Sequence, residues 1–83
     1  MRKEFEDTLL STFLSLKTKQ EVKTFLQGIL TPQEFEEIAT RLQIVKKLKA
    51  GISQHKIAQE LGVGVATVTR GSKEIQKGRF QNV

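Results

Sequence analysis

The sequence predicts an all-α fold, and three features of its 83 residues support that prediction. Apolar residues recur at spacings of three and four, capping boxes precede the apolar runs, and glycines follow them. So short a chain forms at most one domain, and we therefore expect residues 1–83 to be a single helical domain. Because such a chain buries little core alone, we expect a partner chain to complete the burial.

Residues 1–30 are predicted to form two amphipathic helices that serve dimerisation. The first, over residues 4–17, would present a wide apolar stripe made by Phe5, Leu9, Leu10, Phe13, Leu14 and Leu16. Thr18 is expected to begin the second helix, because its hydroxyl can accept from the amide of Glu21 while the Glu21 carboxylate reaches back. Gly28 is expected to end that helix.

Residues 31–51 are predicted to form a long central helix. The sequence TPQE at residues 31–34 is a second capping box, with proline at the first helical position, where its missing amide hydrogen costs nothing. Apolar residues then step by three and four along one face, at Phe35, Ile38, Leu42 and Val45. Gly51 is expected to end this helix.

Residues 53–77 have the spacing of a helix-turn-helix, followed by a tail over 78–83. Ser53 is expected to cap a short first helix, in which Ala58 is small enough for a second helix to cross closely. Gly62 is expected to take the left-handed backbone conformation that ends this helix. Gly64 would leave its amide uncovered at the start of the second helix, where an amide can meet a phosphate.

The second of these helices is predicted to have an apolar face and a basic face. Val65, Val68, Ser72 and Ile75 are expected to face inward, with Ala66, Thr69, Arg70 and Lys73 on the outside. Small polar side chains can enter the major groove of DNA, and cations can hold its phosphates. Residues 51–83 also contain five basic and two acidic residues. The pattern favours DNA binding over a helical hairpin without DNA, which stays an alternative.

Composition disfavours an enzyme, a metal site and a membrane protein. The chain has no cysteine and a single histidine, His55, so neither a thiolate site nor a multi-histidine site can form, and no metal or catalytic cofactor is expected. No phosphate-cradling glycine loop and no nucleophile with its base can be assembled. Neither a membrane span nor the apolar core of a signal peptide is evident, so we expect a cytoplasmic location.

Two strings, LTPQEFEEIATRLQIVKKLKAG and SQHKIAQELGVGVATVTRGS, resemble the bacterial tryptophan repressor family from Leu30 to about Ser72. The resemblance implies a Trp repressor-like helix-turn-helix fold in an intertwined homodimer that binds a double-stranded DNA operator, with L-tryptophan as corepressor. The family's C-terminal helix has no counterpart after Phe80 and is expected to be missing.

The resemblance also implies residues for each contact. Bases would be met by Gln54, Val65, Ala66 and Thr69, and phosphates by Lys56, Gly64, Arg70 and Lys73, with His55 at the entrance of the short helix. Tryptophan would be bound by Thr31, Arg41, Thr67, Arg70 and Gly71, with the backbone near Gly28 and Leu30 accepting from its ammonium group. A guanidinium can stack on an indole and pair with a carboxylate.

Three positions depart from the family. Glu74 stands where the family has a serine near the ligand's amino group, and His55 and Ala58 stand where well-known members have basic residues that contact DNA. Arg41 and Arg70 could instead pair with Glu37, Glu74 or a DNA phosphate.

Three functions therefore stay open. They are a tryptophan-gated repressor, a related regulator that does not respond to tryptophan, and a helical dimerisation or adaptor module without specific DNA binding.

Overall fold

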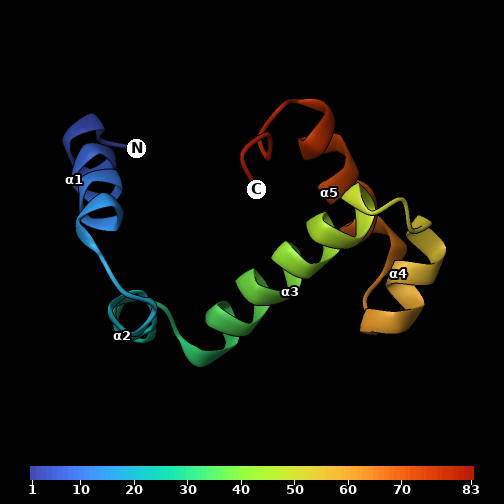
Figure 1. The fold of residues 1–83 in the computed structure, drawn as a ribbon, viewed down its shortest axis with the longest axis horizontal. Helices are drawn as coiled ribbons and strands as arrows, with labels where there is room; N and C mark the ends of the chain where they lie inside the picture. Colours follow the sequence, from blue (N-terminus) through green and yellow to red (C-terminus); the bar gives the residue numbers. More distant parts are fainter. The chain divides into compact units, whose positions relative to one another are not determined.

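The computed structural model describes all 83 residues and contains five α-helices and no strand. The helices are α1 (Lys3–Ser15), α2 (Lys19–Ile29), α3 (Pro32–Lys49), α4 (Gln54–Leu61) and α5 (Val65–Gln76), as labelled in Figure 1. This confirms the all-α prediction. The chain forms two compact units, residues 1–35 and residues 36–83, which are described separately below. The organisation into a single domain stays a prediction.

The predicted capping boxes begin α2 and α3. At α2 the Thr18 hydroxyl accepts from the Glu21 amide at 3.0 Å, and the Glu21 carboxylate accepts from the amide of Lys17 at 2.8 Å. At α3 the Thr31 hydroxyl accepts from the Glu34 amide at 3.1 Å, and the Glu34 carboxylate accepts from the Thr31 amide at 2.8 Å. Each box satisfies backbone donors that the first helical turn leaves unpaired.

The capping box at the start of α3 lowers the pKa of the Glu34 carboxylate. The hydrogen bonds from the Thr31 backbone and side chain lower the pKa of Glu34 below its usual 4.5, because they favour the charged form. This carboxylate lies at the N-terminal end of α3, where the partial positive charge of the helix also favours an anion.

The glycine predicted to end α2 does not do so. Gly28 lies inside α2, which continues to Ile29 and ends with Leu30 in an extended conformation, its amide donating to Leu26 at 2.9 Å. Gly28 does not have a positive φ, so its backbone needs no glycine. The expected ends at Gly51 and Gly62 are confirmed, because these residues have φ of 85° and 66° in the turns that follow α3 and α4.

The unit of residues 36–83 has a small core where the C-terminal half of α3 meets α4 and α5 (Figure 1). Its buried members are Ile44, Ile57, Ala58 and Val68, and Leu48, Ile52, Leu61 and Val63 pack partly buried against them. Ala58 is 7% exposed, which confirms that a small residue lies where the helices cross. A side chain at Gly71 would lie only 3.1 Å from Ile44, so α5 approaches α3 closely at this glycine.

The unit of residues 1–35 has no buried side chain in either of its two complete helices. Phe13 and Phe25 meet edge to face with ring centroids 5.3 Å apart. Large apolar side chains nevertheless stay exposed along α1 and at the end of α2, namely Phe5, Leu9, Leu10, Phe13, Leu14 and Ile29. The expected helix over residues 4–17 is shorter than predicted, because α1 ends at Ser15 and Leu16 is extended.

No helix in the structure combines the length and the apolar character needed to cross a lipid bilayer.

Candidate functional site

The turn between α4 and α5 places an uncovered helix N-terminus at the surface. Ser53 caps α4 by accepting from the Lys56 amide at 3.2 Å, and Gly62 ends it in the left-handed conformation. Gly64 then begins α5 with no side chain capping its amides, and a side chain there would meet no atom within 4 Å. The Thr67 amide donates to the Gly64 carbonyl at 3.1 Å, and the amides before it in the first turn of α5 are open to a hydrogen-bond acceptor from outside the chain.

The two predicted faces of α5 are present, with one exception. Val68 is fully buried in the core, and Ser72 and Ile75 are partly buried. Val65 was expected to face inward, but it is 38% exposed, because it lies in the first turn of α5 before the helix reaches the core. On the outward face, Ala66, Arg70 and Lys73 are exposed and Thr69 is partly buried.

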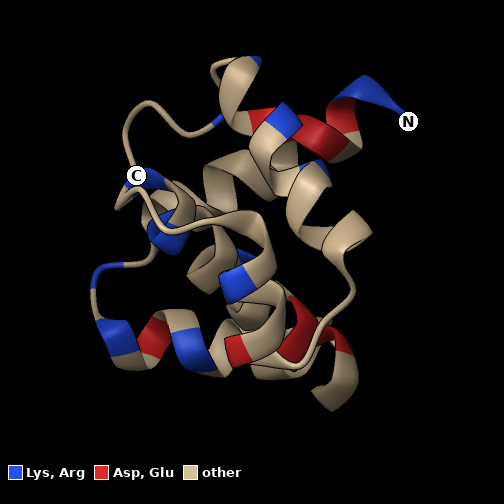
Figure 2. Cartoon of the chain, turned by 90° about the vertical axis from the view of Figure 1, so that its right-hand side faces the viewer, with Lys and Arg blue, Asp and Glu red and all other residues tan.

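A shallow hollow runs along this outward face of α5. Three of the residues that line it are cations, Arg70, Lys73 and Lys77, and one is an acid, Glu74. Figure 2 shows blue basic residues near the C label, and at the N label a blue end of the chain followed by red acidic residues. The basic excess predicted for residues 51–83 therefore includes the face of α5 that is open to solvent.

Side chains of α4 lie beside this face. His55 and Lys56 are exposed, so both are accessible to a partner. Gln54 is partly buried and accepts a hydrogen bond from the hydroxyl of Thr69 on α5, with 2.7 Å between Thr69 Oγ1 and Gln54 Oε1. Ala58 is packed in the core and does not extend the exposed face.

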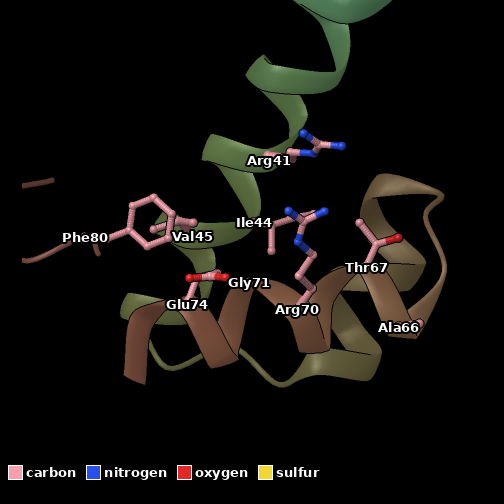
Figure 3. A pocket seen from close by; sticks show the side chains of 9 residues that line it. All are labelled: Arg41, Ile44, Val45, Ala66, Thr67, Arg70, Gly71, Glu74 and Phe80. Carbon is pink, nitrogen blue, oxygen red and sulfur yellow. The ribbon is translucent and has the colours of Figure 1, made fainter. Parts of the chain in front are cut away.

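A pocket of about 340 Å³ lies between α3, α5 and the chain that follows α5. It is lined by Arg41, Ile44, Val45, Ala66, Thr67, Arg70, Gly71, Glu74 and Phe80. In Figure 3 the side chains of Arg41 and Arg70 extend toward the same side of the pocket as Thr67, whereas Glu74 and Phe80 lie at the other end, beside Val45. The walls between these ends are apolar.

The pocket brings together four of the five residues expected to bind tryptophan: Arg41, Thr67, Arg70 and Gly71. The fifth, Thr31, belongs to the other compact unit, where its hydroxyl and amide are engaged in the capping box of α3. Sequence reasoning missed Ile44, Val45 and Phe80 as pocket residues, and it expected Ala66, which also lines the pocket, only at the DNA. Phe80 is the one aromatic residue after position 35, which was a usable signal.

Residues after α5 fold back to complete the pocket. Gly78 has φ of 81°, which turns the chain, and the Lys49 ammonium donates to the Phe80 carbonyl at 2.6 Å. Glu74 forms ion pairs with Arg79 at 3.4 Å and Lys77 at 3.6 Å, both exposed. No group of three or more acidic, histidine or cysteine side chains is placed to hold a metal ion.

Comparison with known proteins identifies the family. The family model described as Trp repressor protein matches residues 5–82. The chain belongs to the Trp repressor family. This confirms the resemblance seen in the sequence and extends it over nearly the whole chain.

Similar proteins include members of the family from several bacteria. A "Trp operon repressor homolog" of Vibrio vulnificus (strain YJ016) is 48% identical over 52 residues, which are 61% of this chain and 51% of that protein. A protein of the same name from Vibrio cholerae is 42% identical over 59 residues, 70% of this chain and 57% of that protein. The "Uncharacterized protein YerC" of Bacillus subtilis is 33% identical over 72 residues, 87% of this chain and 69% of that protein. The chain spans about half the length of the first of these relatives.

Proposed function

We propose that this member of the Trp repressor family is a sequence-specific DNA-binding regulator of transcription that acts as a repressor in the cytoplasm. The observation that best supports the proposal is the helix-turn-helix of α4 and α5, in which Val68 is buried while Ala66, Arg70 and Lys73 face solvent. The names of the Vibrio relatives point the same way. No catalytic role is assigned to any residue.

The exposed face of α5 has the chemistry needed to dock in the major groove. Ala66 and Val65 are small apolar groups that fit against a thymine methyl, and the open amides at Gly64 can meet a phosphate. Lys56 and Lys73 would hold the backbone, and His55 would lie where α4 enters the groove. This is the docking mode of helix-turn-helix proteins, of which the tryptophan repressor is itself a standard example.

The binding form would be a homodimer. The apolar side chains along α1 are exposed in the single chain, with Leu14 at 87% and Phe5 at 61%. A second copy of the chain would cover them, since both copies present the same stripe and most stable oligomers are two-fold symmetric. The two α5 helices would then read two related half-sites of one operator.

L-tryptophan is the proposed corepressor, and the pocket between α3 and α5 is its proposed site. Its volume of about 340 Å³ is in the range of small-molecule sites, with apolar walls at Ile44, Val45 and Gly71. Arg41 and Arg70, which extend toward the same side of the pocket, would enclose the indole and pair with the carboxylate.

Binding in this pocket would act on DNA through α5. Because α5 forms one wall and α3 another, a ligand between them would fix the tilt of α5 relative to the core. Operator affinity would rise only if the ligand prefers the tilt that fits the groove, since equal affinity for both tilts would shift nothing.

A second candidate is a DNA-binding regulator that does not respond to tryptophan. Two observations favour it: Glu74 is already paired with Arg79 and Lys77, and Phe80 supplies an aromatic side chain of the chain's own to the pocket.

The DNA-binding proposal can be tested by selecting duplexes from a randomised library and then measuring affinity for the enriched sequence. Ala66→Asp should abolish the enrichment, because a carboxylate on the exposed face of α5 repels phosphates. It should not unfold the protein, because an acidic residue in the first turn of a helix is favourable. Ser11→Asp, on an exposed polar position of α1, makes the same change in net charge and should leave enrichment intact. Equal enrichment by wild type and Ala66→Asp would contradict the proposal.

Tryptophan gating can be tested by calorimetric titration with L-tryptophan, followed by operator binding with and without it. Arg41→Ala is the informative variant, because Arg41 is on α3 and its loss leaves the exposed face of α5 unchanged. The wild type should bind saturably and hold DNA more tightly with ligand, whereas Arg41→Ala should lose both effects and keep its ligand-free DNA affinity. No heat from a wild type that binds its enriched duplex would favour the second candidate.

A further inference from the structure

The hydrogen bond between Thr69 and Gln54 joins two residues that were each expected to contact a base. It spans 15 positions in sequence and links the outward side of α5 to the first residue of α4. Both side chains are partly buried, and the 2.7 Å between their oxygens is an ordinary distance for a hydroxyl that donates to an amide oxygen.

This hydrogen bond engages the Thr69 hydroxyl proton and the Gln54 side-chain oxygen, and it leaves the Gln54 side-chain nitrogen unengaged. A threonine hydroxyl has one proton, and here that proton is donated to Gln54 Oε1. The two donors of Gln54 Nε2 have no hydrogen-bond partner within the chain. Since every buried side-chain nitrogen and oxygen in the structure has a partner, Nε2 is not one of the buried atoms. The Nε2 group of Gln54 is therefore open to an acceptor from outside.

The hydrogen bond to Thr69 sets the direction in which Gln54 presents its donors. A glutamine recognises adenine by presenting its oxygen and its nitrogen together to one base edge. The Thr69 hydroxyl occupies one of the two lone-pair positions of Oε1 and fixes the plane of the amide, so the direction of the Nε2 donors is set before DNA is bound. The Nε2 group can donate, and the acceptors that DNA offers are phosphate oxygens, the N7 atoms of guanine and adenine, guanine O6 and thymine O4.

We propose that Thr69 is a positioning residue whose hydroxyl fixes the Gln54 amide, so that Gln54 Nε2 donates to an acceptor on DNA. Gln54 makes the hydrogen bond to DNA, and Thr69 contributes only by holding the Gln54 side chain in place. This inference rests on the proposed DNA-binding function and changes the role expected for Thr69 within it. Fixing the amide before binding matters because a free glutamine side chain would lose rotamer freedom on contact with DNA.

A double-mutant cycle on the enriched duplex tests the coupling. Gln54→Ala and Thr69→Val should each lower affinity about three- to tenfold, the loss typical of one hydrogen bond. The double variant should be no weaker than Gln54→Ala alone, because Thr69 has nothing left to position. Thr69→Ser keeps the hydroxyl and should stay within about twofold of the wild type.

The coupling in DNA affinity separates positioning from a purely structural role. Thermal unfolding of the wild type, Gln54→Ala, Thr69→Val and the double variant provides the comparison. If Thr69 only supports the fold, Thr69→Val should lower DNA affinity in proportion to its loss of stability, whether or not Gln54 is present. Losses in affinity that add up in the double variant would show that Thr69 contacts DNA itself and would overturn the inference. Full affinity in Thr69→Val would overturn it as well.

Modified duplexes identify the acceptor. If Gln54 donates to a purine N7, 7-deazaguanine or 7-deazaadenine at one position should weaken the wild type and leave Gln54→Ala unaffected. If Gln54 donates to a phosphate, a methylphosphonate at one linkage should weaken binding by the wild type and leave binding by Gln54→Ala unaffected. Sensitivity of both proteins to every modification would contradict a contact by Gln54. A wild type that enriches no duplex would remove the proposed function together with this inference, whereas additive losses on an enriched duplex would remove the inference alone.

Discussion

Replacing Gly62 by alanine should destabilise the helix-turn-helix, whereas the same replacement at Gly64 should not. Gly62 has φ of +66°, a conformation that costs an ordinary residue about 1–2 kcal/mol. A side chain there would meet no atom within 4 Å, so the backbone is the only source of strain. Alanine also reduces the conformational entropy of the unfolded chain, which stabilises the folded state by about 0.4–1 kcal/mol. The net loss should be about 1 kcal/mol.

Gly64 is the matched control for this prediction. Its φ of −71° and ψ of 149° suit any residue, and a side chain there would also meet no atom within 4 Å. Only the entropy gain then applies, so Gly64→Ala should leave stability unchanged or raise it slightly. Its methyl group would stand beside the open amides of α5, so DNA affinity should fall while the fold stays intact.

Thermal unfolding followed by circular dichroism, at one fixed protein concentration because dimerisation shifts the midpoint, is the assay. For a chain of this size a loss of about 1 kcal/mol lowers Tm by about 4–8 °C. We expect that decrease for Gly62→Ala and none for Gly64→Ala. Equal shifts in the two variants, or a higher Tm for Gly62→Ala, would refute the reasoning that the left-handed turn depends on glycine.

Three further changes have defined outcomes. Gly28→Ala should raise helix stability by about 0.5–1 kcal/mol in chemical denaturation, because Gly28 lies inside α2 with open space around it, and a loss would instead indicate a glycine-dependent helix end. The lowered pKa of Glu34 means that its stabilising effect on α3 is present above its ordinary pKa of 4.5 and is lost as pH falls through the lower folded value. Stability measured from pH 6 to about pH 3 should therefore fall more in the wild type than in Glu34→Gln, and parallel curves would argue against the box. Lys73→Ala should lower affinity for all duplexes alike and reduce the slope of log K against log salt by about 0.9, whereas an unchanged slope would remove Lys73 from the phosphate contacts.

Helix starts could be predicted from the sequence because they depend on local chemistry. A threonine hydroxyl and a glutamate three residues later are enough to define the boxes at Thr18 and Thr31. The prediction that α2 ends at Gly28 was wrong, because the position of its end depends on the start of α3. Thr31 precedes Pro32, which disfavours the helical conformation at Thr31, so α2 can continue until Leu30.

The site was predictable where family motifs cover it and not where the chain folds back on itself. Arg41, Thr67 and Gly71 follow from the motif and line the pocket. Phe80 reaches the pocket because Lys49, 31 residues earlier, holds its carbonyl, and no local pattern encodes that contact. The exposure of Val65 follows from how far along α5 the core begins, which periodicity alone does not indicate.

The most direct test of the proposed function is the ratio of two affinities, measured at one salt concentration. One is the affinity for the enriched duplex, and the other is the affinity for a duplex of the same composition in shuffled order. Specific binding by the α4–α5 helix-turn-helix predicts a ratio of about a thousand or more. Equal affinities, falling together as salt rises, would show binding by charge alone and would favour a helical dimerisation module whose basic end meets another partner.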